Sequence, residues 1–200
     1  MDEKPLLFHT GLRRQFALTR DAIARVMPPE RLYHVASSHF EADECGALND
    51  FLAVAPQARP LCGKISAMVS IGDMADRPPR ALADGKEMTL GRHTVRWIEA
   101  PHLPHAWDCG FLFETATRTL FCGDLFAHSG DRLAPIVETD IFGPSEAFRK
   151  QMDYFSHTRD VRALMEKIIA TRPTTVATMH GSAWRGDGAQ LLGALADALA

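Results

Sequence analysis

The chain has 200 residues, enough for one domain that buries most of its apolar surface without disulfides. Hydrophobic residues make up 46% of it and charged residues 24%, as in average soluble globular proteins, which excludes disordered and fibrous classes. The formal net charge of −3 gives no electrostatic basis for binding nucleic acid or an anionic membrane. We therefore expect a single domain over residues 1–200, with neither of these as a partner.

The cysteines indicate a reducing environment. None of the four forms a Cys-x-x-Cys pair, and a chain of this size needs no disulfide framework. The first ten residues lack the long apolar core of a signal peptide, and no apolar run is long enough to span a membrane. A cytoplasmic protein with free thiols is expected.

The first part of the chain is expected to alternate strands and helices. Thr10 is suited to cap the first helix, which Pro28 and Pro29 end. The expected strands cover residues 6–9, 32–37 and 61–62, and the expected helices cover residues 12–27, 46–54 and 65–71.

From residue 84 the pattern changes to short strands of period two. Two hairpins are expected, with strands at 88–90 and 93–99 and then at 111–114 and 119–122. Ser145 and Asp160 are suited to cap two helices. The remaining expected elements are helices over 145–155, 161–170 and 190–200 and a strand over 174–178. This mixture predicts an α/β or α+β class.

The sharpest motif follows the second expected strand. The run His39-Phe40-Glu41-Ala42-Asp43-Glu44 places ligand-type side chains at i, i+2 and i+4. In an extended chain these side chains share one side. Converging imidazole and carboxylate groups suit a borderline to hard metal ion. Taken alone, the same run is also compatible with a solvated surface turn.

Three more clusters of this kind follow apolar strands. His102 and His105 follow residues 95–100, Asp124 follows 119–122, and His180 follows 174–179. Sites in mixed α/β folds gather where strands end, so four such clusters favour a metal site over unrelated turns. The remaining histidines are expected to be surface or core residues: His9, His34, His93, His128 and His157.

The order of the ligand-type residues resembles the metallo-β-lactamase superfamily. Its usual signature is His-x-His-x-Asp-His, and Glu41 in the second position is similar to flavodiiron proteins and the single-domain oxygen-binding diiron proteins. The flanking segments also resemble that subgroup. They are Met88-Thr89-Leu90-Gly91, Leu120-Phe121-Cys122-Gly123-Asp124 and Met179-His180-Gly181-Ser182-Ala183-Trp184-Arg185.

The resemblance implies an αββα sandwich, here lacking the first N-terminal strands that family members carry before the equivalent of Leu6. It also implies two metal ions, with iron expected and zinc or manganese as alternatives. One ion would be held by His39, Glu41 and His105, the other by Asp43 and His180, and Asp124 would bridge them.

Two departures concern individual ligands. Glu44 stands where the superfamily usually has a histidine, and an added carboxylate favours iron or manganese over zinc. His102 and His105 both offer an imidazole for the third ligand. The spacing from His105 to Asp108 is similar to that from the ligand histidine to the following aspartate in the family, so the resemblance favours His105 and leaves His102 as an alternative ligand or a loop residue. Glu44 and Asp108 are also candidate acceptors for the free ring N–H groups of the ligand histidines.

The resemblance implies binding or reduction of dioxygen or nitric oxide, with no catalytic side chain beyond a metal-bound oxygen species. Because no flavodoxin-like part is present, electrons would come from a separate protein, and a sensor that binds the gas is the other form of this function. The alternative class is a zinc or manganese hydrolase in which a bridging water attacks its substrate. A homodimer is expected by family analogy and because the first sheet has an uncovered edge.

Overall fold

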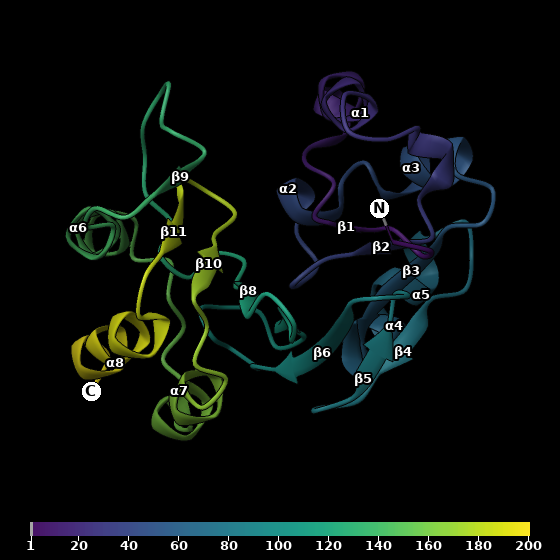
Figure 1. Ribbon diagram of the computed structural model, residues 1–200. Coiled ribbons are helices and arrows are strands. Elements are labelled where there is room, and N and C mark those ends of the chain that lie inside the picture. The colour runs from purple at the N-terminus through teal and green to yellow at the C-terminus, as the bar shows by residue number, and fades with distance from the viewer. Residues whose placement is uncertain (1) are drawn as a thin grey trace.

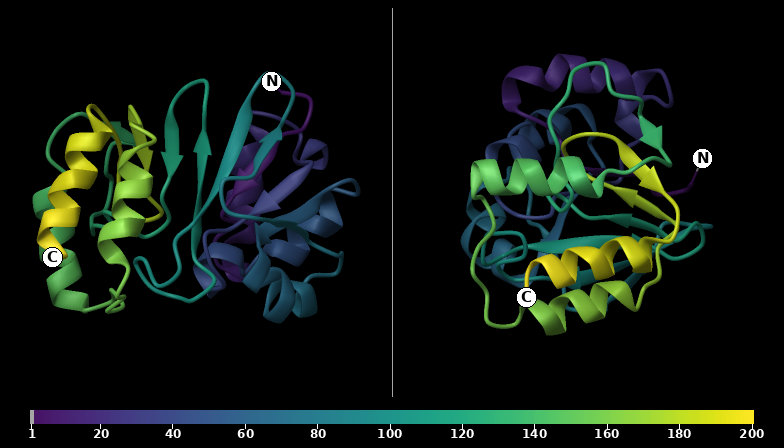
Figure 2. Two further views of the ribbon diagram at one scale, coloured as in Figure 1. Left: turned by 90° about the horizontal axis from the view of Figure 1, so that it is seen from below. Right: turned by 90° about the vertical axis from the view of Figure 1, so that its left-hand side faces the viewer.

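The computed structural model describes residues 2–200, which form two β-sheets packed face to face with helices on both outer faces (Figures 1 and 2). The first sheet is parallel, with its strands in the order β1 (Leu6–Phe8), β2 (His34–Ala36), β3 (Arg59–Gly63) and β4 (Arg80–Leu82). The second sheet is mixed and has the order β5 (Glu87–Thr89), β6 (Thr94–Glu99), β7 (Gly110–Glu114), β8 (Thr119–Phe121), β10 (Thr175–Ala177), β11 (Ala183–Arg185) and β9 (Ile136–Val137).

The helices divide between the two halves of the chain. Those of the N-terminal half are η1 (Arg13–Gln15), α1 (Phe16–Ala24), η2 (Pro29–Arg31), α2 (Ala42–Cys45), α3 (Leu48–Val54), α4 (Lys64–Val69) and α5 (Ile71–Met74). Those of the C-terminal half are α6 (Phe142–Met152), α7 (Val161–Ile169) and α8 (Gly188–Ala198), and they cover the second sheet (Figure 2).

Alternation of side chains along the strands builds three apolar layers. In β2, Val35 packs outward in the cluster that contains Phe51 of α3, whereas Ala36 faces the space between the sheets. In β7, Leu112 lies between the sheets with Trp97, and its neighbours on either side pack outward among residues of α7 and α8. This alternation produces the αββα arrangement that the sequence predicts.

The strand and hairpin predictions are confirmed, whereas several helix ends differ. Thr10 caps no helix, since its hydroxyl accepts a hydrogen bond from the Ala47 backbone (3.1 Å). Ser145 lies inside α6, which begins at Phe142 because Asp140 accepts the first backbone N–H (2.8 Å). Asp160 is at the cap position of α7 without a capping side-chain bond. Strands β4, β9 and β11 were not predicted, because two or three residues carry too little periodicity.

Two expectations from composition can be compared with the fold. All four cysteines are buried free thiols, as predicted: Cys45, Cys62, Cys109 and Cys122. Within residues 2–200, none of the helices has the length and apolar character that crossing a bilayer requires.

The buried His34 makes stability dependent on pH. Neither of its ring nitrogens has a hydrogen-bond partner, and burial, followed by Arg80 and Lys4, lowers its pKa to about 4. An unfolded histidine titrates near pH 6.5, so below that pH the unfolded state gains a proton that the folded state excludes. We expect the His34 contribution to lower the free energy of unfolding by about 2 kcal/mol between pH 7 and pH 5.

Urea unfolding of the parent and of His34→Leu, at several pH values between 7 and 5, measures this contribution. The variant should lose less stability on acidification than the parent does. Equal pH dependence of the two proteins would contradict the assignment.

Candidate metal centre

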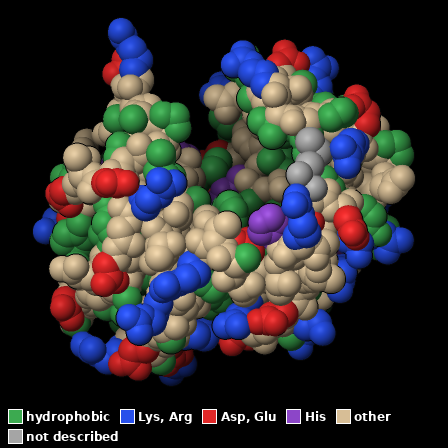
Figure 3. Space-filling model, viewed as in Figure 1, with side chains coloured by type: hydrophobic (Ala, Val, Ile, Leu, Met, Phe, Trp, Pro, Cys, Tyr) green, Lys and Arg blue, Asp and Glu red, His purple; other side chains and the backbone are tan. Residues whose placement is uncertain are grey.

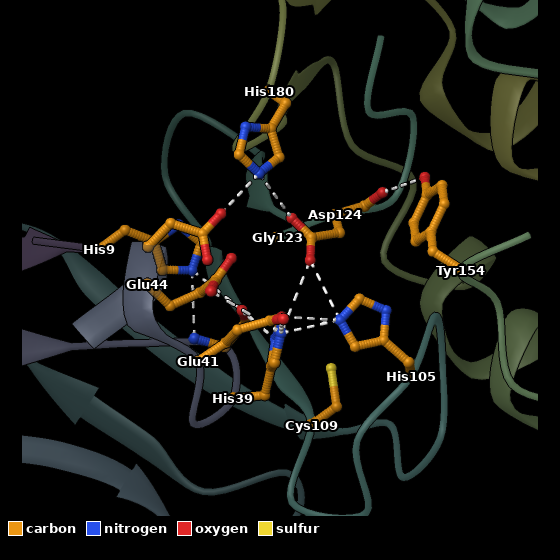
Figure 4. A network of polar contacts seen from close by, with 12 residues as sticks. His9, His39, Glu41, Glu44, His105, Cys109, Gly123, Asp124, Tyr154 and His180 are labelled. Carbon is orange, nitrogen blue, oxygen red and sulfur yellow. Dashed lines mark hydrogen bonds and ion pairs between the residues drawn. The ribbon is translucent and has the colours of Figure 1, made fainter. Parts of the chain in front are cut away.

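The predicted ligand residues converge at one end of the sandwich, where strands of both sheets finish (Figure 4). His39 lies just beyond β2 in the first sheet, and His105 lies in the loop that joins β6 to β7. Asp124 follows β8 and His180 follows β10, and these two strands are parallel neighbours, so their ends coincide. The site therefore lies at the seam between the sheets. Figure 3 shows the molecule hollowed there, with histidine at the floor of the hollow.

The first group of ligand atoms consists of two imidazoles and two carboxylates that converge. Nε2 of His39 lies 3.0 Å from Nε2 of His105 and 2.9 Å from Oε2 of Glu41. The distance from His105 Nε2 to the same Glu41 oxygen is 3.1 Å. Oδ2 of Asp124 completes the group, 3.6 Å from His39 and 3.4 Å from His105.

The second group uses the other oxygen of Asp124. Nε2 of His180 lies 3.5 Å from Asp124 Oδ1 and 3.1 Å from Asp43 Oδ2. The carboxylate of Glu44 also belongs to this group, and the ligand atoms of Asp43, Glu44 and His180 lie within 4.8 Å of one another. Asp124 therefore faces both groups, with one oxygen toward each (Figure 4).

The backbone explains why the motif after β2 serves two groups. Glu41 itself is extended (φ −144°, ψ 159°), and its carboxylate meets His39 as predicted, although the chain bends at residues 38–40. Helix α2 begins at the next residue, which places Asp43 and Glu44 on its first turn. The expectation of one extended run from His39 to Asp43 is therefore wrong, because the chain bends before Glu41 and becomes helical after it, where Asp43 meets His180.

Buried polar atoms without partners show that the pocket fits cations. Both oxygens of Glu44 and Oδ1 of Asp124 are buried and accept no hydrogen bond. Leaving such groups unsatisfied is costly, and positive ions at the two groups would satisfy them. Four carboxylates contribute to the groups, and two divalent ions would balance their full charge. The mixture of imidazole and carboxylate suits a borderline to hard ion.

The carboxylates differ in their pKa values. Burial, followed by the neighbouring Asp124 and Asp43, raises the pKa of Glu44 to about 10. Burial also raises the pKa of Asp124, although three imidazoles oppose the effect. For Glu41, burial acts in the same direction, but the imidazoles of His39 and His105 beside its carboxylate outweigh it and the pKa is lowered. The charged forms of Glu44 and Asp124 are therefore the ones that a nearby positive ion would stabilise most.

The structure distinguishes the two histidines of the loop after β6. His105 joins the first group, whereas the His102 side chain is exposed and is absent from both groups among residues 2–200. The His102 backbone N–H donates to the Ala106 carbonyl (2.8 Å), and both residues have positive φ (63°). This tight turn presents the intervening His105 to the site.

The prediction that Glu44 and Asp108 accept hydrogen bonds from the ring N–H groups of the ligand histidines is wrong. Neither Glu44 nor Asp108 accepts a hydrogen bond from a ligand histidine, and Asp108 keeps a buried oxygen without a partner. Nδ1 of His39 instead contacts the Ser38 hydroxyl at 2.9 Å, and Nδ1 of His105 is buried without a partner.

His128 supports the loop that carries His180, although the sequence suggested no role for it. Its Nδ1 donates to the Phe126 carbonyl (2.9 Å), and its Nε2 accepts from the Ser182 backbone N–H (3.0 Å). Gly181 is required beside it: its φ is +108°, and a Cβ there would lie 2.3 Å from the His128 ring. The sequence signals this supporting role of His128 only by placing it four residues after Asp124.

Tyr154 and His9 also contact residues of the site, although the sequence did not indicate a role for either. The Tyr154 hydroxyl donates to the Asp124 backbone carbonyl (2.9 Å), and its ring meets His105 edge to face with centroids 5.8 Å apart. His9 contacts Ser38 behind His39, and burial lowers the pKa of His9 to about 3, so its imidazole is neutral. Both residues are far from the motifs in the chain and reach the site only through the fold.

A family model of ODP family beta lactamases matches residues 1–181 of the chain. The chain belongs to this family. The match confirms the resemblance to the metallo-β-lactamase superfamily and its flavodiiron and ODP subgroup that the order of ligand residues predicts.

Sequence relatives of this ODP-family chain are longer flavoproteins. A diflavin flavoprotein of Synechocystis sp. is 25% identical over 178 residues, which cover 86% of this chain and 30% of the relative. An anaerobic nitric oxide reductase flavorubredoxin of Pectobacterium carotovorum is 27% identical over 206 residues, which cover 96% of this chain and 39% of the relative. The chain thus spans about a third of the length of the curated relatives that it matches.

Solved structures share the fold. The rubredoxin oxygen:oxidoreductase of Desulfovibrio gigas superposes with a TM-score of 0.82 at 20% identity, covering 98% of this chain and 50% of that one. The chemotaxis sensor ODP from T. denticola superposes with a TM-score of 0.80 at 19% identity, covering 97% and 82%. The predicted metallo-β-lactamase-like sandwich is therefore confirmed.

Proposed function

We propose that this chain holds two iron ions and binds dioxygen or nitric oxide at them. The observation that carries the proposal is the position of Asp124, whose two oxygens face two separate groups of ligand atoms. In this proposal one ion is held by His39, Glu41 and His105, and the other by Asp43 and His180. Asp124 contributes one oxygen to each ion.

The donor set supports iron over zinc. Besides three imidazoles, the two groups contain four carboxylates: Glu41, Asp43, Glu44 and Asp124. Carboxylates favour harder ions, whereas zinc sites favour nitrogen and sulfur ligands. In particular, Glu44 adds a carboxylate at the second ion, where the superfamily signature has an imidazole. Relatives whose names state nitric oxide reductase and oxygen:oxidoreductase activity agree with this choice.

Iron in this position would supply the electrons and the open coordination positions that gas binding needs. Neighbouring residues of the chain hold and orient the ligand side chains. The Tyr154 hydroxyl and the Ser38 hydroxyl fix the backbone of Asp124 and the ring of His39. Of the aromatic residues beside the ligands in sequence, Phe126 is buried in the core, whereas Phe40 and Trp107 are exposed.

Binding of the gas is the part of the function that these residues can perform by themselves. Reduction of the gas would draw electrons from a separate protein or from another part of a longer chain. Without that supply, the centre would report the gas as a sensor does. A single domain, a homodimer and a cytoplasmic location remain predictions from the sequence.

Metal analysis with optical spectroscopy tests the proposal. The protein is purified without oxygen and supplied with Fe(II), and its iron and zinc contents are measured. We expect two iron ions per chain and an absorption band that appears on adding dioxygen. Two zinc ions per chain that iron cannot replace, without an oxygen-dependent band, would overturn the iron assignment and favour the metallo-hydrolase.

A further inference from the structure

His9 lies directly behind the metal centre because two strands of the first sheet end together. Strands β1 and β2 are parallel, with Phe8 opposite Ala36, so the residue after β1 lies beside the residues after β2. The His9 backbone N–H continues the ladder by donating to the Ala36 carbonyl (2.8 Å). At His9 the chain turns with φ 66°, and its ring, which is 8% exposed, packs on Phe8 with ring centroids 4.2 Å apart.

A short hydrogen-bonded chain joins His9 to His39. Nε2 of His9 lies 3.0 Å from the Ser38 hydroxyl, which lies 2.9 Å from Nδ1 of His39. The Ser38 backbone N–H also points at His9 Nε2, at 3.2 Å. All of these atoms are buried, so water does not compete for them.

The backbone N–H of Ser38 fixes the direction of this chain. A backbone N–H only donates, so His9 Nε2 is an acceptor and the neutral ring carries its proton on Nδ1. The Ser38 hydroxyl can then donate to His9 Nε2 and leave its oxygen to accept from His39 Nδ1–H. With its proton on Nδ1, His39 presents a bare Nε2 to the first group of ligand atoms.

We propose that His9 is a positioning residue for the metal centre, acting through Ser38 to hold His39 in the tautomer and orientation that bind a metal ion. The proposal rests on the proposed function, because it explains how His39 is held ready to bind a metal ion. Histidine ligands typically depend on a partner at the second ring nitrogen. Here the partner is the Ser38 hydroxyl, which can donate or accept a hydrogen bond. Because His9 Nε2 can only accept, the hydroxyl donates to His9 and accepts from His39.

Close packing keeps Ser38 where this role requires it. Gly123, which precedes Asp124, has φ +52°, and a Cβ there would lie 2.8 Å from the Ser38 hydroxyl oxygen. No larger side chain fits between the two loops, so Ser38 lies against the backbone that carries Asp124. The same hydroxyl therefore connects the His39 loop of the first sheet to the Asp124 loop of the second.

Anaerobic titration with Fe(II) tests the proposal on His9→Leu, His9→Gln and Ser38→Ala. Leucine removes the acceptor, and we expect Fe(II) to bind about 10- to 100-fold more weakly. Glutamine offers an oxygen near the position of Nε2 and should restore most of the affinity. Ser38→Ala should weaken binding as His9→Leu does, and combining the two should add little, because both interrupt one chain.

His34→Leu is the matched control, since His34 is a buried histidine of the neighbouring strand that contacts no ligand residue. Its Fe(II) affinity should equal that of the parent. Equal affinities in the parent and His9→Leu would overturn the proposal. If His9→Leu does not fold, as judged by circular dichroism, Ser38→Ala decides in its place.

Nitrogen-15 NMR of the histidine rings in the metal-free parent gives a readout that needs no iron. We expect the proton of His9 on Nδ1 and an acceptor shift at Nε2. A proton on Nε2 would overturn the proposal. If the parent binds no iron yet shows the expected tautomer, with zinc binding weakened by His9→Leu, the iron function fails and the role of His9 stands.

Discussion

Replacing Asp124 with Asn is expected to abolish stable binding of both metal ions. Asp124 directs one oxygen at the group of His39 and His105 and the other at His180, and Asn keeps only one oxygen and no charge. Altering residues that merely support a ligand costs about 10- to 100-fold in metal affinity, so loss of the shared ligand should cost more than about 100-fold. Metal content after dialysis against a weak chelator measures the effect.

Glu114→Gln is the matched control for this experiment. Glu114 is also a buried carboxylate, but it accepts hydrogen bonds from the backbone of Ala116 and Thr117, away from the site. This variant should retain its metal. Retention of both ions by Asp124→Asn would contradict the bridging role.

The same Asp124 variant should stabilise the metal-free protein. Burial raises the pKa of Asp124, which means that its charged form is held less favourably in the folded state than in the unfolded state. Asn removes that charge at pH 7, so the free energy of unfolding of the metal-free variant should exceed that of the metal-free parent. Urea unfolding of the metal-free variant and the metal-free parent measures the difference in the free energy of unfolding. A gain in stability would indicate that Asp124 is retained for metal binding and not for folding.

Replacing Phe111 with Ala is expected to have the largest effect on stability. Phe111 is fully buried in β7 and packs in the cluster that joins the second sheet to α7 and α8. Removing a buried aromatic ring leaves a cavity and typically lowers the free energy of unfolding by about 3–5 kcal/mol. Denaturant unfolding of the metal-free protein, where no ion adds to stability, measures this loss directly.

Phe111→Ala should also weaken metal retention, because a Cβ at Gly123 would lie 3.9 Å from the Phe111 ring. The ring therefore lies under the backbone that leads to Asp124. Leu18→Ala on α1 is the control: that side chain is 73% exposed, so its removal should change stability by no more than about 0.5 kcal/mol. A loss below about 1 kcal/mol in Phe111→Ala would show that the neighbouring side chains refill the space.

The sequence predicted those parts of the fold and site that depend on local pattern. Alternation identified the strands that end at the site, and the residues placed after those strands meet in space. His39 and Glu41 meet as the motif predicts, although the chain bends at residues 38–40 rather than running extended. Where local preference and tertiary packing compete, the sequence was less informative. Asp43 turns away because α2 begins at Ala42, and no cap residue announces that start.

The supporting contacts could not be predicted, because each joins residues far apart in the chain. Ser38 meets His9 only when β1 pairs with β2, and Tyr154 reaches Asp124 only when the segment after α6 packs under the loop after β8. A hydroxyl or a lone histidine has many possible partners in a sequence, and topology selects one. Nearness in sequence favours Glu44 and Asp108 as partners, but it is a poor guide to hydrogen bonding across a sheet.

The position of the centre at the seam between the sheets has a consequence for the lifetime of the protein. His39 and Asp43 come from the half of the chain that forms the first sheet, and Asp124 and His180 from the half that forms the second. An ion bound by ligands from both halves of the chain would stabilise their association, because separating the halves would cost part of the binding free energy of the ion. Without the ion, this link between the two halves of the chain is absent. Proteases should then cut the apoprotein faster than the loaded form, and cellular levels of the protein should follow the supply of metal.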